Sequence, residues 1–241
     1  MSLQIIRPGP LASVQDLGRY GHRQLGICPG GALDTLALAL ANRLVGNAGG
    51  AGGLELTLGS CEIRFEQDTR IALAGEAFGA TLDGVSLVPC WSVPVQSGQT
   101  LRLGGAASGV RPGLRTWLAV AGGVDVPAVL GSRSTDLKAG FGGLEGRALR
   151  KGDRLPIGES RLSEAQRQRK PFGVRAPEHG DAPGEPTTLR VLPGPEAEQF
   201  LQASRKQLHA EDWRITPQSN RMGSRLSGHQ LKRPKGSTDK L

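Results

Sequence analysis

The chain has 241 residues, which is long enough for one large or two small domains with a sizeable core. Its 36 glycines follow no G-X-Y repeat, so collagen is excluded and short strands joined by tight turns are favoured. Residues 161–241 hold 15 Lys and Arg against 9 Asp and Glu and so carry most of the +8 formal charge. The 4% aromatic content and the absence of a nucleic-acid-binding motif nevertheless argue against a nucleic-acid partner.

Residues 3–6 are predicted to form an opening strand that ends at a proline- and glycine-rich turn. The polar residues Gln15, Asp16 and Arg19 follow, interspersed with glycines. Glycine lets a backbone approach a ligand closely, so this loop can present an amide, a carboxylate and a guanidinium together. The structural alternative is a surface loop that only leads into the next element.

Residues 33–44 are predicted to form a helix with one apolar face, because their apolar residues recur at helical spacing: Leu33, Leu36, Ala37, Leu40 and Leu44. Gly46 and Asn47 are residue types that end helices. Asp34 lies in the first turn, where a carboxylate suits the positive end of the helix dipole.

Brief strands are predicted to follow at 54–58, 61–65, 71–74, 93–95, 101–103 and 116–121. The clearest hairpin is at 80–88, where Asp83-Gly84 is a dipeptide typical of a type I′ turn. Such a succession of strands indicates a barrel or a sandwich rather than alternating strands and helices.

The loop at 131–143 is the second segment rich in polar chemistry, with Ser132, Arg133, Ser134, Thr135 and Asp136 in succession. Hydroxyl and guanidinium donors together suit an anion such as phosphate or carboxylate. The segment is not a P-loop, because GxxxxGK[ST] occurs nowhere in the chain. A solvated turn is the structural alternative.

The remainder of the chain divides into a predicted closing strand at 154–157, a linker and a second unit. Residues 159–188 are basic and proline-rich and are interpreted as an exposed linker, so that the first domain covers 1–158 and the second begins at 189. In the second unit a helix is predicted from Pro195 to about His209. A polar turn near 217–228 then brings Asn220 and Arg221 together.

The three cysteines, Cys28, Cys61 and Cys90, are widely spaced and indicate neither a metal site nor a disulfide framework. No apolar run is long enough to span a membrane, and residues 1–9 lack the hydrophobic core of a signal peptide. The cytoplasm is therefore the expected location, with no membrane partner.

Several motifs together resemble one known family: QDLGRYG at 15–21, LGSRSTDLKAGFGG at 130–143, LRVLPGP at 189–195 and TPQSNRMGSRLSG at 216–228. This is the biotin-dependent carboxyltransferase or allophanate hydrolase subunit 2 family, also called KipA-like. Its bacterial members include the C-type subunit of ATP-dependent 5-oxoprolinase.

The resemblance implies a mainly β fold with two cyclophilin-like β-barrel domains and a few short helices. Family members continue beyond the SNRMG motif, so the second barrel, at 189–241, is expected to be incomplete here. The implied function is ATP-dependent opening of the lactam of 5-oxo-L-proline to L-glutamate, with a KipI-like B-type subunit and a LamB/YcsF-like A-type subunit. The alternatives are a carboxyltransferase component of a urea carboxylase system and a non-catalytic module that binds a KipI-like kinase inhibitor.

Given this resemblance, the residues expected to be catalytic are Gln15, Asp16, Arg19 and Asp34. Those expected to bind substrate or an anion are Ser132, Arg133, Ser134, Thr135, Asp136, Asn220 and Arg221. ATP is expected in the complex and no metal is expected. The only methionines are Met1 and Met222, and neither has a lysine beside it, so any biotin has to come from another chain.

Overall fold

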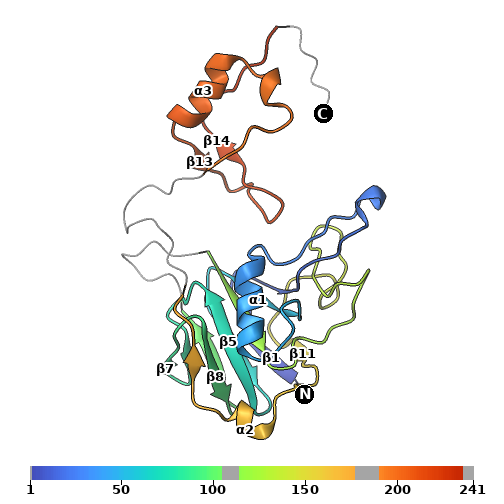
Figure 1. Ribbon diagram of the computed structural model, residues 1–241, viewed down its shortest axis with the longest axis vertical. Helices are drawn as coiled ribbons and strands as arrows, with labels where there is room; N and C mark the ends of the chain where they lie inside the picture. Colours follow the sequence, from blue (N-terminus) through green and yellow to red (C-terminus); the bar gives the residue numbers. More distant parts are fainter. Residues whose placement is uncertain (1, 105–113, 177–189, 236–241) are drawn as a thin grey trace. The chain divides into compact units, whose positions relative to one another are not determined.

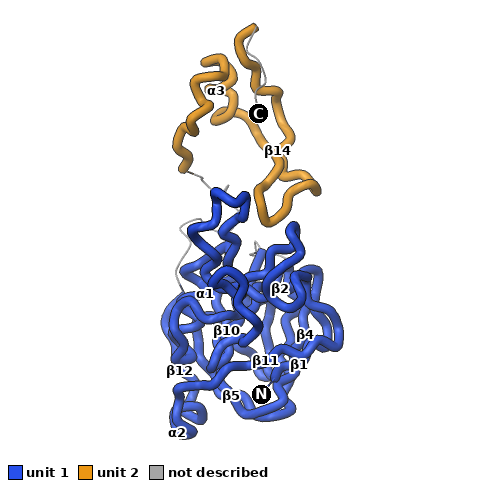
Figure 2. Tube along the Cα trace, turned by 90° about the vertical axis from the view of Figure 1, so that its right-hand side faces the viewer, with its two compact units in different colours: residues 1–184 blue, residues 185–241 orange. Residues whose placement is uncertain are grey.

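Short antiparallel strands make up most of the regular structure, with few and short helices, which confirms the mainly β prediction. The computed structural model describes residues 2–104, 114–176 and 190–235. It divides into two units, residues 1–184 and residues 185–241 (Figure 2). None of the described helices is both long enough and apolar enough to cross a membrane.

The first unit contains two six-stranded antiparallel sheets (Figure 1). In spatial order the first sheet consists of β11 (Arg154–Pro156), β1 (Ser2–Arg7), β4 (Cys61–Phe65), β9 (Thr100–Leu103), β6 (Thr81–Leu82) and β7 (Val85–Ser86). The second consists of β12 (Phe172–Gly173), β8 (Trp91–Val95), β5 (Thr69–Gly75), β10 (Arg115–Val120), β3 (Gly53–Thr57) and β2 (Leu11–Gln15).

Both sheets face one apolar core, as the walls of a barrel do, although the pairings among the described residues do not join one sheet to the other. Alternate residues of each strand supply this core, which is why the period-two pattern of the sequence located the strands. Examples are Leu3 and Ile63 from the first sheet and Leu54 and Leu118 from the second. The hairpin turn is also as predicted, because Asp83 and Gly84 both have positive φ.

Helix α1 (Thr35–Leu44) covers the outer face of the second sheet, against β5 and β10 (Figure 1). The helix was predicted correctly, and its buried face was predicted in part. Leu36 is 81% exposed, whereas Leu38 and Ala41 are fully buried. The packing surface on the sheet is built mainly of alanines, including Ala72 and Ala119. Ala37, Leu40 and Leu44 of the predicted stripe pack against it, whereas Leu33 and Leu36 are exposed.

Two further differences concern segments that were expected to be irregular. Residues 11–15 form strand β2, whose polar Ser13 and Gln15 alternate with core residues and are nevertheless buried. The first part of the expected linker packs on the first unit through α2 (Glu164–Arg167) and β12, and Leu162 contacts the alanine surface beneath α1. The 3-10 helix η1 (Arg23–Leu25) completes the first unit.

The second unit, in its described residues 190–235, holds one strand pair, β13 (Arg214–Ile215) with β14 (Leu226–Ser227). Its helical part is split into η2 (Ala197–Gln199) and α3 (Gln202–Ala210), so the single helix predicted from Pro195 is wrong. The break lies at Phe200 and Leu201, which have extended ψ angles of 146° and 143°.

Candidate functional site

The end of strand β2 and the loop at 129–135 lie side by side, although they are far apart in the sequence. The Thr135 amide donates to the Val14 carbonyl at 3.0 Å, and the Asp16 amide donates to Ser134 Oγ at 2.9 Å. The loop therefore continues the edge of the second sheet beyond β2. This contact brings the two polar segments singled out in the sequence into one cluster.

Asp16 is the centre of this cluster and is buried. Its Oδ1 accepts hydrogen bonds from the Gly18 amide at 2.7 Å, Ser132 Oγ at 2.6 Å and Ser134 Oγ at 2.5 Å. Its Oδ2 accepts the Arg133 amide at 2.6 Å. A carboxylate with all of these donors holds the loop to the strand and has little capacity left to accept a substrate proton.

Burial alone would raise the pKa of Asp16, but these hydrogen bonds outweigh it and lower the pKa below its ordinary value. Asp16 is therefore ionised at neutral pH. The same effect makes it a weak general base.

Arg19 is buried with a relative exposure of 1% and has no carboxylate within ion-pair distance among the described residues. Its Nη2 donates to the Ser134 carbonyl, its Nε donates to the Val129 carbonyl at 3.4 Å, and its guanidinium carbon lies 4.6 Å from the centre of the Phe141 ring. Its Nη1 is buried and has no hydrogen-bond partner within the described part of the chain. An unpaired buried donor on a cation is costly, so this atom calls for an explanation.

Gln15 is likewise fully buried and only partly satisfied. Its Nε2 donates to Ser13 Oγ at 3.0 Å and to the Thr135 carbonyl at 3.3 Å, while its Oε1 has no partner. Gln15 and Arg19 thus bind the adjacent carbonyls of Thr135 and Ser134, and each retains one unused polar atom, an acceptor and a donor respectively.

The hydroxyls of the loop are used within the protein. Those of Ser132 and Ser134 donate to Asp16, and Thr135 Oγ1 donates to the Val14 carbonyl at 3.0 Å. Arg133 pairs with Asp125 at 2.8 Å, although its buried Nε has no partner. These hydrogen bonds hold the loop in place and leave few donors for an external anion.

Asp136 and Phe141 shape the turn that supports Arg19. Asp136 Oδ1 accepts the amides of Lys138 and Ala139 at 3.1 and 3.0 Å, and the Asp136 amide donates to the Phe141 carbonyl at 2.9 Å. This closed turn holds the Phe141 ring against Arg19. Sequence reasoning did not single out Phe141, and its only signal was an aromatic residue among glycines.

Glu55 was also missed, because it alternates with leucines on β3 and resembled a solvent-facing residue. It is 1% exposed and accepts the Leu33 amide at 2.9 Å and Trp117 Nε1 at 3.2 Å. It also pairs with Arg115 at 3.5 Å. The loop before α1 covers this face of the sheet, which a two-residue pattern could not reveal.

The remaining predicted residue of the first unit, Asp34, lies outside the cluster. Asp34 is exposed and is the N-cap of α1, where its Oδ1 accepts the Ala37 amide at 2.9 Å. Asn220 and Arg221 belong to the second unit, where Asn220 Oδ1 accepts the Met222 amide at 2.7 Å. The structure therefore unites Gln15, Asp16 and Arg19 with 132–135 and assigns Asp34 to a helix cap.

Residues 25–240 match the family model of the carboxyltransferase domain, subdomain A and B. The chain is 48% identical to the C-type subunit of 5-oxoprolinase from Escherichia coli over 96% of its own length and 70% of that protein. It is 33% identical to urea amidolyase of Lachancea kluyveri over 96% of its length and 13% of that protein.

Solved structures agree with these matches. The crystal structure of TTHA0988 superposes with a TM-score of 0.80 at 33% identity and covers 99% of this chain and 81% of that one. The urea amidolyase of K. lactis superposes with a TM-score of 0.78 at 30% identity and covers 96% of this chain and 14% of that one.

Proposed function

The chain belongs to the carboxyltransferase domain family, subdomain A and B, and on that basis we propose that it acts as the C-type subunit of an ATP-dependent 5-oxoprolinase. In this reaction water adds across the lactam C–N bond of 5-oxo-L-proline to give L-glutamate, and ATP is cleaved. A KipI-like and a LamB/YcsF-like subunit complete the enzyme. The observation that carries the proposal is the 48% identity to the corresponding 5-oxoprolinase subunit over almost the whole chain.

The unpaired polar atoms of the cluster support a role in substrate binding. A lactam with a carboxylate offers one N–H donor and several oxygen acceptors. Gln15 Oε1 is an unused acceptor and Arg19 Nη1 an unused donor, so the two match that pattern. In this proposal Gln15 accepts the lactam N–H, and Arg19 donates to a substrate oxygen that carries negative charge.

Asp16 and Ser134 are positioning residues in this scheme. Asp16 accepts a hydrogen bond from Ser134 Oγ, and the Ser134 carbonyl accepts one from Arg19. Displacement of the carboxylate would therefore shift the peptide that orients the guanidinium. Ser132, Arg133 and Thr135 hold the same loop in place.

The cluster around Asp16 does not fit an ATP triphosphate. A triphosphate requires several cationic or N–H donors around an open cradle. Here Arg133 is paired with Asp125, and the hydroxyls of 132–135 donate to protein acceptors, so the cluster keeps few unused donors, Arg19 Nη1 among them. We therefore assign ATP to another subunit and derive no step through it.

The test is reconstitution. The chain is co-expressed with KipI-like and LamB/YcsF-like subunits, and glutamate and ADP are measured from 5-oxo-L-proline. The proposal expects turnover that requires this chain and is lost in Arg19→Lys, whereas Arg154→Lys, an exposed surface variant, keeps it. Absence of turnover in the complete mixture of purified, folded subunits contradicts it.

Carboxyl transfer is the second candidate, because the family is named for it and urea amidolyases share 33–34% identity with the chain. The same preparation distinguishes the two reactions. Consumption of carboxybiotin with urea, without glutamate formation from 5-oxo-L-proline, would transfer the assignment to this chemistry.

A further inference from the structure

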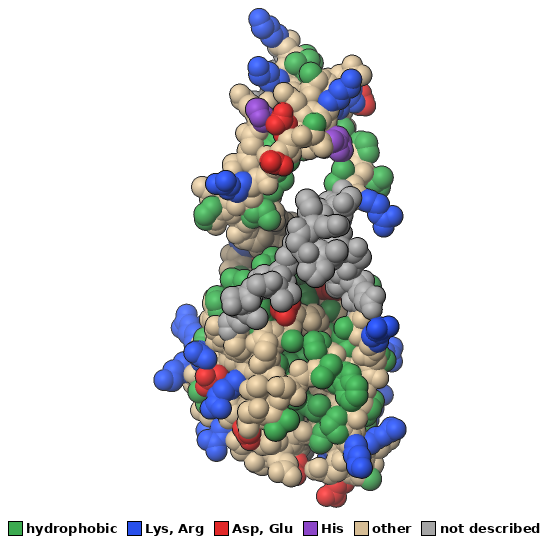
Figure 3. Space-filling model, turned by 90° about the vertical axis from the view of Figure 1, so that its left-hand side faces the viewer, with side chains coloured by type: hydrophobic (Ala, Val, Ile, Leu, Met, Phe, Trp, Pro, Cys, Tyr) green, Lys and Arg blue, Asp and Glu red, His purple; other side chains and the backbone are tan. Residues whose placement is uncertain are grey.

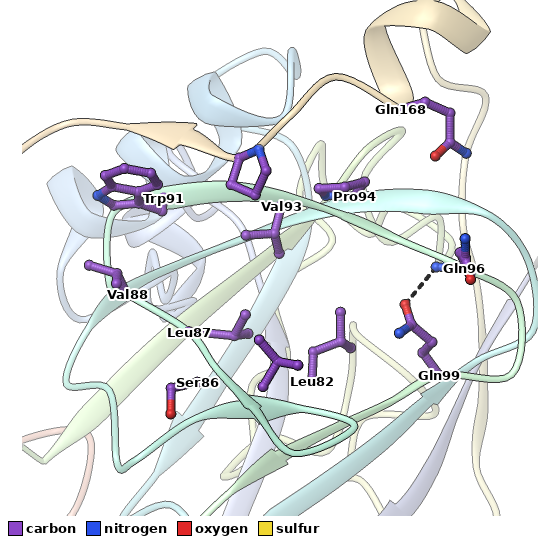
Figure 4. A pocket seen from close by; sticks show the side chains of 12 residues that line it. Leu82, Ser86, Leu87, Val88, Trp91, Val93, Pro94, Gln96, Gln99 and Gln168 are labelled. Atoms are coloured by element: carbon purple, nitrogen blue, oxygen red, sulfur yellow. Dashed lines mark hydrogen bonds between the residues drawn. The ribbon is translucent and has the colours of Figure 1, made fainter.

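An apolar pocket of about 530 Å³ lies well away from the cluster around Asp16 (Figure 4). It opens beside β8, and β5, β10 and β3 separate that strand from β2 within the second sheet. Its volume is within the range of binding pockets. Its twelve lining residues come from β6 to β8, the turn after β8 and the segment before β12, and they include Leu82, Val85, Leu87, Val88, Trp91 and Val93.

The pocket exists because the core-facing side of each sheet extends beyond the area that the opposite sheet covers. Leu82 pairs directly with Val85, so the two side chains share a face, yet Leu82 is 7% exposed and Val85 is 70% exposed. On β8 the same change occurs between Val93, at 9%, and Trp91, at 38%. Figure 4 shows Leu82 and Leu87 on one side of the opening and Val93 on the other.

The apolar lining of the pocket reaches the surface of the first unit. Val85 and Val88 are both exposed, and Figure 3 shows apolar side chains gathered on the face of the first unit where β7 and β8 lie. Exposed apolar side chains gathered at one opening are typical of a protein-interaction site. Strand β7 pairs only with β6 among the described residues, so its outer edge remains open for another strand.

The charges around the pocket restrict its occupant. None of its twelve lining residues is charged at neutral pH, and its polar side-chain groups are the Ser86 hydroxyl, the Trp91 indole N–H and the carboxamides of three glutamines. The exposed Arg169 and Lys170 lie between the lining residues Gln168 and Pro171 in the chain. The pocket therefore suits an uncharged apolar group, and its rim at Gln168 suits an acidic one.

We propose that this opening binds an extended peptide segment of another subunit, whose apolar side chains fill the pocket and whose acidic residue meets Arg169 and Lys170. The backbone of the segment would pair with β7, and its side chains would complete the core between the two sheets. The choice of subunit for the test rests on the proposed function, which supplies the KipI-like protein as the probe.

The experiment measures binding of the purified KipI-like protein to the full chain by calorimetry. Val88→Asp puts a charge into the pocket and is expected to weaken binding by about 30-fold or more. Leu36→Asp is the control, because Leu36 is also an exposed apolar residue but lies on α1, and the affinity of this variant is expected to stay within about twofold of wild type. Lys170→Glu weakens binding by about threefold at low salt, and by less at high salt.

Thermal melting first establishes that each variant is folded. Wild-type affinity in Val88→Asp overturns the docking proposal, as does an apolar dye that occupies the pocket and is not displaced by the KipI-like protein. If Val88→Asp binds with wild-type affinity and also forms glutamate normally in the three-subunit mixture, the docking proposal is rejected and the proposed function is retained. If the wild-type chain neither binds the KipI-like protein nor supports turnover of 5-oxo-L-proline, both proposals are rejected.

Discussion

Asp16 and Ser134 are 118 residues apart in the chain and bind each other twice. The Asp16 amide donates to Ser134 Oγ at 2.9 Å, and the same hydroxyl donates to Asp16 Oδ1 at 2.5 Å. One serine thus satisfies both the backbone and the side chain of the aspartate. This contact joins the end of β2 to the loop whose carbonyl orients Arg19.

Asp16→Asn is expected to destabilise the first unit by about 3 kcal/mol, because it removes a buried charge that accepts four hydrogen bonds. The loss also depends on pH. The folded pKa of Asp16 is lowered, so its contribution is complete above the unfolded pKa of about 3.9 and disappears as pH falls through the folded value. Urea unfolding from pH 7 to pH 2.5 should show the wild type and variant converging at the acidic end; a constant gap would refute this account.

Arg19→Lys is expected to reduce turnover by about 100-fold or more in the reconstituted enzyme, because an ammonium cannot bind the Ser134 carbonyl, stack on Phe141 and reach a substrate oxygen together. If Arg19 contacts substrate, kcat/KM falls in the variant, while the pH at which the free energy of unfolding is half of its maximum stays that of the wild type. A variant that loses stability but keeps kcat/KM would show that Arg19 is only structural.

Gly142→Ala is expected to disturb the same site through the backbone. A Cβ there would lie 2.2 Å from the Ser134 carbonyl oxygen and 2.8 Å from Arg19 Nη2, at a φ of +71°. We expect the free energy of unfolding to fall by more than about 2 kcal/mol. Gly152→Ala is the control: it has a φ of +91° but no atom within 4 Å, so it should cost only the conformational strain of about 1–2 kcal/mol. Equal losses of unfolding free energy in the two variants, measured by urea unfolding, would contradict the predicted clash.

Arg70→Lys is expected to release residues 160–173 from the first unit. Arg70 is buried, and its guanidinium donates to Ser92 and to the carbonyls of residues 166, 167, 169 and 170. Lysine has three donors on one atom and cannot bridge this set. Hydrogen exchange in 160–173 should accelerate at least tenfold, about 1.4 kcal/mol, while β1 and β4 change little. Unchanged exchange in this segment would count against the anchoring role.

The cysteines offer a test of burial. Burial raises the pKa of Cys61 to about 12 and also raises the pKa of Cys90, so neither forms a thiolate readily, whereas Cys28 is only half-buried. A disulfide reagent at pH 8 should therefore modify one thiol in the native protein and three after unfolding. Rapid modification of Cys61 in the native state would show that the core opens.

Local patterns in the sequence were enough to predict most strands, helix α1 and the Asp83-Gly84 hairpin, because backbone period and turn chemistry act between near neighbours. Local patterns did not predict burial that depends on residues distant in the sequence. Ser13 and Gln15 looked like loop residues and Glu55 like a solvent-facing one, because nothing local announces that an opposite layer will cover a polar strand face. Of the predicted stripe of α1, Ala37, Leu40 and Leu44 pack on the sheet, but Leu36 is exposed.

For the candidate site, the sequence alone determined which polar residues were available, their family motifs and the two segments in which they lie. Only the tertiary structure decided that Asp16 is fully bonded, that Asp34 caps a helix, and that Gln15 and Arg19 each keep one unused atom. Hydrogen-bond satisfaction depends on partners more than a hundred residues away, and those partners acquire positions only when the sheets close around a common core.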